Sequence, residues 1–361
     1  MSTSTSSSPR TTAPPAPSRW ASLGRTVLTQ RVVLLAVLVA AVVATFTALD
    51  LAGRTSGPYN PDYLAGSLIN VVPTAMLGLA ELLVIVSGRG GIDLSVGAMV
   101  SLVGMGFGFC YGLWGWPLWV AVPAAVLGGA VLGAVNGFLV AHLRFPALIA
   151  TLATYYAYKS IAIVVNDQQP INSPRVQDLY ATARAVELPL IGAQLPLLPL
   201  GVVLFLLPTV LVVWYVVDRS PYGRRLFAVG TNDVAATWAG IGVTATRFWA
   251  YAGAGAISGL VAVVTVGQFA SARPDAGTSG NGMALPAITI AVLAGVAITG
   301  GIGRVSGVVL AAVLVAWLNA GVLLTFPGNA GTRLQLLALG LLLVLAALFN
   351  GWTNRRYRIL G

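Results

Sequence analysis

The chain has 361 residues, of which 57% are hydrophobic and only 8% are charged. Soluble domains carry roughly a quarter charged residues, so this composition excludes an ordinary water-soluble protein and predicts a membrane protein. The net charge of +10 does not indicate a nucleic-acid partner, because the basic residues stand singly between apolar runs, as membrane topology produces.

Apolar runs fill most of the chain. A helix needs about 20 mostly apolar residues to cross a bilayer, and about ten such runs occur here. They predict an all-α polytopic membrane protein of about ten transmembrane helices, some of them broken at glycines. The predicted spans are about Val32–Leu49, Leu64–Ser87, Leu94–Leu113, Trp116–Val140, Phe145–Val165, Leu195–Val217, Phe248–Phe269, Leu285–Thr299, Val305–Phe326 and Leu334–Phe349. The run Leu285–Thr299 is short for a full span and predicts a half-helix.

Both ends of the chain lie outside these runs. Residues 1–30 are rich in Ser, Thr and Pro, which predicts a disordered tail, and residues 351–361 form a basic C-terminal tail. The transmembrane domain covers residues 31–350, and its longest inner loop is 218–247. With the N-terminus in the cytoplasm, most of the 20 Lys and Arg residues fall on the inner side. This bias predicts a multi-pass plasma-membrane protein with both termini cytoplasmic.

One short sequence occurs twice in the chain. GGIDLSVG, residues 90–97, has a counterpart in GGIGRVSG, residues 300–307, and each follows one apolar run and opens the next. Glycine adopts backbone conformations that other residues avoid, and broken helices at matching places form the path in many transporters. The pair predicts an internal repeat whose helix breaks act as a gate. The candidate gate residues are Gly90, Gly91, Asp93, Ser95, Gly97, Gly300, Gly301 and Gly303.

The first motif places a carboxylate, Asp93, among glycines and aliphatic residues. Two interpretations are open. Asp93 can cap the start of the following helix and pair with Arg89, or it can work in the gate or in a partner contact. Nothing in the neighbouring sequence points to acid–base catalysis.

Polar residues inside the predicted spans are candidates for a translocation path. They are Asn70, Glu81, Asn136, Thr154, Tyr155, Gln268 and Asn319. Such residues serve equally well as hydrogen-bonding contacts between helices. Glu81 lies well inside a span, so it is a functional candidate by default, unless it pairs with Lys159 or a backbone carbonyl.

The residue sets that catalysis requires are missing from the sequence. The only lysine is Lys159, so there is no phosphate-binding loop of the G-x-x-x-x-G-K-[ST] type. The single histidine, His142, and the single cysteine, Cys110, leave no metal-ligand or nucleophile set. The sequence therefore predicts neither an enzyme nor a bound cofactor.

The inner loop 218–247 contains a short predicted helix within TNDVAATWAGIG. Thr231 or Asn232 can cap its start, Asp233 suits its first turn, and Gly240 can end it. An exposed apolar face on such a helix either lies on the lipid surface or docks into a partner. The apolar residues that fall on one face at helical spacing are Val234, Trp238 and Ile241.

Four motifs carry a resemblance to a known family. In chain order they are GGIDLSVG, GAVNGFLVAHLRFPALIATLATYY, YGRRLFAVGTNDVAATWAGIGV and GGIGRVSG. From about Leu64 to Asn350 the chain resembles the membrane subunit of ATP-binding-cassette (ABC) importers of the ribose/xylose type. The resemblance implies a permease that moves a monosaccharide across the plasma membrane by alternating access. It also implies three partners: a second permease copy or paralogue, an ABC ATPase subunit that binds the ATP, and an extracellular sugar-binding protein.

The resemblance further implies that TNDVAATWAGI is the coupling helix, which fits a groove in the ATPase. The residues assigned to ATPase coupling are Asn232, Asp233, Ala235, Ala236, Trp238, Gly240 and Ile241. The sequence departs from the family pattern where Arg89 precedes GGID, and where Val296 and Ala297 replace a Thr-Ser pair.

Two other functions stay open at the level of sequence. One is a permease for branched-chain amino acids or nucleosides, which shares the broad architecture. The other is an ion-coupled secondary carrier that uses Glu81 or Lys159.

Overall fold

The computed structural model describes residues 31–182, 185–186, 198–279 and 282–357. The tail predicted for residues 1–30 lies outside the described residues. The final helix, α15 (Asn329–Tyr357), runs past residue 350, so the predicted C-terminal tail begins as helix.

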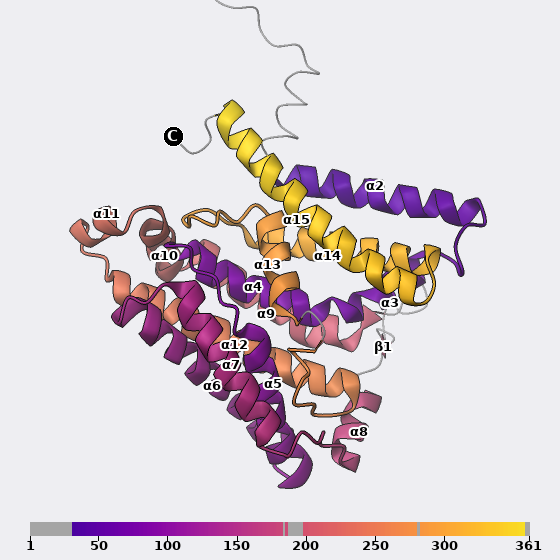
Figure 1. Cartoon of the computed structure of the whole chain (residues 1–361), viewed down its shortest axis with the longest axis horizontal. Coiled ribbons are helices and arrows are strands. Elements are labelled where there is room, and N and C mark those ends of the chain that lie inside the picture. Colours follow the sequence, from indigo (N-terminus) through magenta and orange to yellow (C-terminus); the bar gives the residue numbers. More distant parts are fainter. Residues whose placement is uncertain (1–30, 183–184, 187–197, 280–281, 358–361) are drawn as a thin grey trace, which may run out of the picture.

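Helices make up most of the described chain, which confirms the all-α class (Figure 1). In chain order they are α2 (Arg31–Leu51), α3 (Pro61–Ser67), α4 (Val72–Val86), α5 (Val96–Phe107), α6 (Leu118–Gly137), α7 (Ala147–Val164), α8 (Pro174–Thr182), α9 (Leu207–Trp214), α10 (Pro221–Thr231), α11 (Asp233–Trp238), α12 (Val243–Phe269), α13 (Ala284–Leu293), α14 (Val305–Thr325) and α15. Wide π-helical turns extend α5 over Gly108–Leu113, α6 over Phe138–His142, and α9 over Val202–Leu206 and Tyr215–Arg219. Two short strands, β1 (Ala185–Val186) and β2 (Leu198–Pro199), pair antiparallel.

The described helices include enough long apolar ones to make the chain a polytopic membrane protein. Seven are long and apolar enough to cross a membrane, or eight if α3 and α4 form one bent span. The two halves of that bent pair meet at 58°, through the 3-10 turn Leu68–Asn70. The expected half-helix is confirmed, because α13 has only 10 residues. At a rise of about 1.5 Å per residue it is about 15 Å long, roughly half the hydrocarbon thickness.

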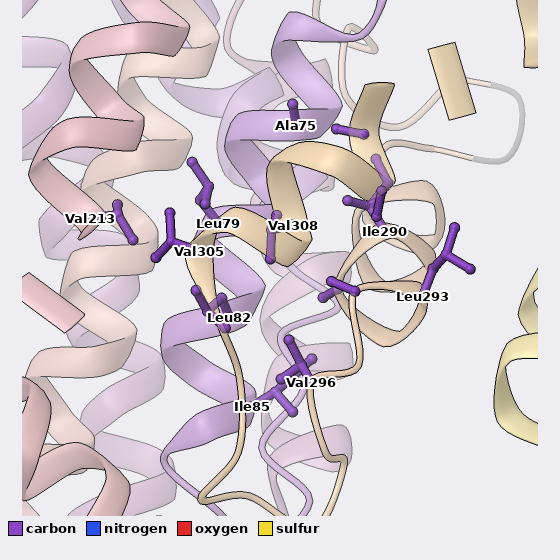
Figure 2. Close-up of a cluster of buried hydrophobic side chains, with 14 of the residues drawn as sticks. Ala75, Leu79, Leu82, Ile85, Val213, Ile290, Leu293, Val296, Val305 and Val308 are labelled. Atoms are coloured by element: carbon purple, nitrogen blue, oxygen red, sulfur yellow. The ribbon is translucent and has the colours of Figure 1, made fainter. Parts of the chain in front are cut away.

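Helix α4 forms the centre of the bundle. All of its residues except Thr74 are buried, including Glu81. Figure 2 shows Leu79 and Leu82 of α4 beside Val305 and Val308 of α14, within one cluster of buried side chains. In a membrane such contacts hold helices together mainly by van der Waals packing, since lipid is as apolar as the side chains.

Glycines bring α6 and α12 into direct backbone contact. A Cβ atom on Gly129 or Gly133 of α6 would collide with backbone atoms of Gly255 in α12. A Cβ on Gly259 of α12 would likewise collide with the Ala125 carbonyl of α6. Small residues spaced four apart allow this close approach, as in other membrane helix pairs.

The two ends of the molecule carry different short elements. Helices α10 and α11 lie at one end of the long helices, and α8 and β1 lie at the opposite end (Figure 1). α12 packs against α10 and α11 as well as α8, so it connects the two ends.

Candidate functional site

The second glycine motif packs against the residues that precede the first one, near the end of α10. The Gly301 amide donates a hydrogen bond to the Val86 carbonyl, 3.0 Å away, so the second motif meets the chain where α4 ends. A Cβ on Gly300 would collide with Gly88, and a Cβ on Gly230 of α10 would collide with both Val86 and Gly301. The region just before GGID, the GGIG motif and α10 therefore form one tightly packed junction. Whether the motifs are a true repeat stays a prediction.

The glycines of the two motifs meet different structural requirements: some have positive φ angles and others pack closely against neighbouring atoms. Gly300 and Gly301 have φ angles of +99° and +73°, which L side chains rarely adopt. Gly97 lies against the Gly277 carbonyl, and the Gly277 amide donates to Ser101 Oγ at 2.9 Å. The remaining gate candidates are Gly90, which has a φ of +62° and open space around it, Gly91, which packs on the Val84 carbonyl, and Gly303, which packs on Leu82 and Val86.

Asp93 lies fully buried just before α5. Its Oδ1 accepts the Ser95 amide at 2.9 Å and the Ser95 hydroxyl at 2.6 Å. The Asn136 side-chain amide, on α6, lies 3.2 Å from each carboxylate oxygen and 2.7 Å from Ser95 Oγ. Asp93 binds the backbone just before α5, but the N-cap of that helix is Ser95 and no side chain caps its first turn, so Asp93 is not its helix cap.

The pairing of Asp93 with Arg89 is wrong. Arg89 has a left-handed backbone, with φ at +57°, and its side chain forms an ion pair with Asp233 at the start of α11. Asp93 instead faces the interior of the bundle, where hydrogen-bond donors from α6 and the motif itself satisfy it.

Three of the path candidates belong to this same buried network. Thr154 of α7 donates to Asn136 Oδ1 at 2.7 Å, and Glu81 Oε2 accepts the Asp93 amide at 3.3 Å. Among the described residues, Glu81 Oε1 and the buried Tyr251 hydroxyl have no hydrogen-bond partner. The pairing of Glu81 with Lys159 or with a carbonyl is wrong, since Lys159 lies over the Tyr155 ring at 5.7 Å.

The other path candidates lie apart from this network. Gln268 of α12 donates to the Ile69 carbonyl at 2.8 Å, next to the exposed Asn70. The Asn319 carbonyl on α14 accepts a hydrogen bond from Gln335 of α15 at 3.2 Å. Tyr155 is half-buried on α7. The seven candidates therefore do not all belong to one hydrogen-bonded network.

Helix α11 is short and capped at both ends. Asn232 Oδ1 accepts the amides of Val234 and Ala235, each at 3.0 Å, so Asn232 rather than Thr231 is the cap. At the other end Gly240 has a φ of +75°, its amide binds the Thr237 carbonyl, and the Ile241 amide binds the Ala236 carbonyl. This is the Schellman arrangement, for which a left-handed glycine is the usual residue.

The side chains of α11 divide between an outer and an inner face. Trp238 is 88% exposed and Val234 is 66% exposed, which matches the predicted apolar face. Ala235 is also exposed and Ile241 is half-buried, whereas Ala236 is buried against the rest of the chain.

Asp233 points inward, toward two arginines. Arg89 Nε lies 2.5 Å from Asp233 Oδ2, and Arg247 Nη2 donates to Asp233 Oδ1 at 2.8 Å. The same Arg247 nitrogen donates to the Ser87 carbonyl, at the end of α4, at 2.9 Å. Sequence reasoning missed the role of Arg247 and counted it only for topology. Its position at the start of a long apolar helix was the available signal, because a buried cation there needs a partner.

A tyrosine also ties α10 to α12. The Tyr222 hydroxyl donates to the Thr246 carbonyl at 2.9 Å. Burial raises the pKa of Tyr222 above its ordinary value, so the hydroxyl stays neutral and available as a donor. Together with the Asp233 contacts, this bond fixes α10 and α11 on the end of the bundle.

Comparison with known proteins gives the family. Residues 63–347 match the family described as branched-chain amino acid transport system / permease component. The chain belongs to this permease family. Permease subunits of this kind are not catalytic and bind no cofactor, so the protein is a transport subunit and not an enzyme. No solved structure matches this chain.

Relatives with named substrates resemble the chain over most of its length. The ribose import permease protein RbsC of Haemophilus influenzae is 28% identical over 86% of this chain and 94% of its own. The autoinducer 2 import system permease protein LsrD of Klebsiella pneumoniae is 31% identical over 84% of this chain and 90% of its own. The fructose import permease protein FrcC of Rhizobium meliloti is 30% identical over 80% of this chain and 77% of its own.

Proposed function

We propose that this permease is the membrane subunit of an ATP-binding-cassette importer that moves a monosaccharide across the plasma membrane by alternating access. The single observation that carries the proposal is the geometry of α11. This helix is capped at both ends, anchored through Asp233, and presents Val234 and Trp238 outward. A fixed short helix with an exposed aromatic side chain suits insertion into a groove of a partner protein.

The partner on α11 is an ABC ATPase subunit in this proposal, and it binds the ATP that drives transport. Arg219, Arg224 and Arg225 lie in or beside α10, at the same end of the molecule as α11. By the positive-inside rule we propose that this end faces the cytoplasm and that both termini are cytoplasmic. The ATPase then meets α11 on the side where ATP is available.

The other two partners complete the importer. An extracellular sugar-binding protein docks at the opposite end, where α8 and β1 lie (Figure 1). A second copy of the permease, or a paralogue, supplies the other half of the path. Family membership and the position of α8 opposite α11 support this arrangement.

The relatives favour a sugar as the substrate. The names of two of the relatives above specify ribose and fructose, which are monosaccharides, and that of a third specifies autoinducer 2. The family description names branched-chain amino acids, so a permease for those, or for nucleosides, is the second candidate. An ion-coupled carrier receives less support, because Glu81 and Lys159 do not form an ion pair: Glu81 accepts the Asp93 amide and Lys159 lies over Tyr155.

Replacement of Trp238 by Ala tests the docking of the ATPase. Truncating an aromatic anchor at an interface costs about 2 kcal/mol or more, which corresponds to roughly 30-fold weaker binding. We expect the Kd of the detergent-solubilised permease for its cognate ATPase to rise by about that factor. Trp119→Ala is the matched control, since Trp119 is 78% exposed but belongs to α6. Unchanged affinity of Trp238→Ala would contradict the assignment of α11.

A further inference from the structure

One residue assigned to the ATPase contact turns toward the permease itself. Asp233 is the first residue of α11, but its side chain is only 18% exposed and lies between Arg89 and Arg247. Resemblance places Asp233 with the residues that meet the ATPase. The geometry separates it from Val234 and Trp238, which are exposed on the outer face.

We propose that Asp233, held between Arg89 and Arg247, is a positioning residue. Through these two ion pairs, movement of α11 is transmitted to the helix break at GGID. This inference rests on the proposed function and adds a route by which the ATPase acts on the membrane helices. Arg89 is the testable part of that route, because it stands directly before the motif and its side chain is exposed.

The contacts around Asp233 reach three separate parts of the chain. Arg89 lies between α4 and α5, Arg247 belongs to α12, and the Ser87 carbonyl ends α4. Arg247 is only 3% exposed, so its charge depends on Asp233 for compensation. Removing one partner of a buried ion pair is strongly unfavourable, so Asp233 and Arg247 must move together.

Arg89 differs from Arg247 because it is solvent-accessible. Its side chain is 57% exposed, and it reaches Asp233 from a backbone with φ at +57°. An exposed ion pair contributes little to stability. What this pair does instead is join the first residue of α11 to the residue that precedes GGID.

Close packing makes the connection stiff. Gly230, near the end of α10, leaves no space for a Cβ against Val86 and Gly301. Because these backbones are in direct contact, a displacement of α11 and the adjoining α10 also displaces the end of α4 and the GGIG motif. From the break, the Asp93 amide reaches Glu81 in the middle of α4, and the Asp93 carboxylate reaches Asn136 of α6. The ion pairs of Asp233, the backbone from Arg89 to Asp93 and these hydrogen bonds thus connect α11 to the centre of the bundle.

Arg144 provides a matched control for a test of Arg89. Arg144 is an exposed arginine between α6 and α7, and its φ of +59° is almost the same as that of Arg89. Glycine adopts this backbone conformation without strain, so Arg89→Gly and Arg144→Gly relieve the same conformational cost. Any difference in coupling between the two variants is then due to loss of the Arg89 side chain and not to the change in backbone conformation.

The experiment measures substrate taken up per ATP hydrolysed in liposomes that contain the permease, its ATPase and its binding protein. Allosteric coupling commonly corresponds to about 5- to 150-fold effects, so we expect Arg89→Gly to lower this ratio by about fivefold or more. Arg144→Gly should leave it unchanged, and Arg89→Lys should restore most of it by keeping the charge. The melting temperature of Arg89→Gly should equal that of Arg144→Gly, which separates positioning from stability.

The outcomes distinguish this inference from the proposed function. Wild-type uptake driven by ATP, together with equal ratios for Arg89→Gly and Arg144→Gly, would overturn the positioning role and leave the importer intact. Wild-type uptake without any dependence on ATP would overturn both. A lowered ratio for Arg89→Gly alone, with rescue by Arg89→Lys, supports the role.

Discussion

Asp93 illustrates how a carboxylate is accommodated inside an apolar helix bundle. Its oxygens receive the amide and hydroxyl of Ser95 and the side-chain amide of Asn136, so its polar atoms are satisfied without a cation from Arg89. A buried charge without such donors would be strongly unfavourable. The network thus holds α5 and α6 together at the helix break.

Asn136 is the residue on which that network depends most. It donates to Asp93 and to Ser95 and accepts from Thr154, which lies on α7. Replacement by Ala leaves these buried groups short of partners, and each unsatisfied group costs about 1–3 kcal/mol. We expect Asn136→Ala to lower the melting temperature of the detergent-solubilised protein by several degrees.

The control for this variant is an asparagine with a single local bond. Asn166 Nδ2 donates to the Gln169 carbonyl at 2.8 Å in an exposed loop. Asn166→Ala should leave the melting temperature nearly unchanged. If both variants melted at the same temperature, the network at Asp93 would not be the structural element described above.

At the scale of elements, local sequence predicts local structure well. The cap at Asn232, the left-handed Gly240 and the outward Trp238 of α11 all follow from residues within one short segment. The half-helix α13 and the bond from Asp93 to the backbone just before α5 were also predictable, since both depend on neighbours in sequence.

Contacts between residues far apart in the chain could not be predicted from the sequence. Arg89 has an acid four residues away at Asp93, yet the structure pairs it with Asp233. Arg247 pairs with Asp233 of α11, and it also donates to the Ser87 carbonyl, 160 residues earlier in the chain. The direction in which a side chain leaves a helix end depends on backbone angles and packing, and a charge pattern alone does not encode these. For the same reason the path candidates separated into different environments.

Two adjacent glycines of α6 allow a test of its close contact with α12. A Cβ on Gly129 would collide with Gly255, whereas a Cβ on Gly128 meets nothing within 4 Å. We expect Gly129→Ala to destabilise the protein by about 1–3 kcal/mol, as overpacking does. Gly128→Ala should be neutral or stabilising by up to about 1 kcal/mol, because Ala favours helix over Gly.

Thermal unfolding of both variants in the same detergent checks this prediction. The two glycines share one helix and adjacent positions, so helix propensity affects them alike. Equal destabilisation by Gly128→Ala and Gly129→Ala would show that close backbone contact does not hold α6 to α12.

At the scale of the whole molecule, the architecture separates three tasks. The buried centre around α4 holds the helix breaks in place, and the end with α10 and α11 presents a fixed apolar surface. The opposite end carries α8 and β1 (Figure 1). A permease of an ATP-driven importer needs such a division, since the ATPase and the binding protein act from opposite sides of the membrane. No chemistry is required of the permease itself.

Uptake by the reconstituted importer tests the central claim most directly. The permease, its cognate ATPase and its binding protein are placed in liposomes, and uptake of pentoses, hexoses, leucine and a nucleoside is measured with and without ATP. The account predicts uptake of a monosaccharide that requires ATP and that persists in Glu81→Gln, because the glutamine oxygen can still accept the Asp93 amide. Uptake that follows an ion gradient without ATP, and that Glu81→Gln abolishes, would contradict it.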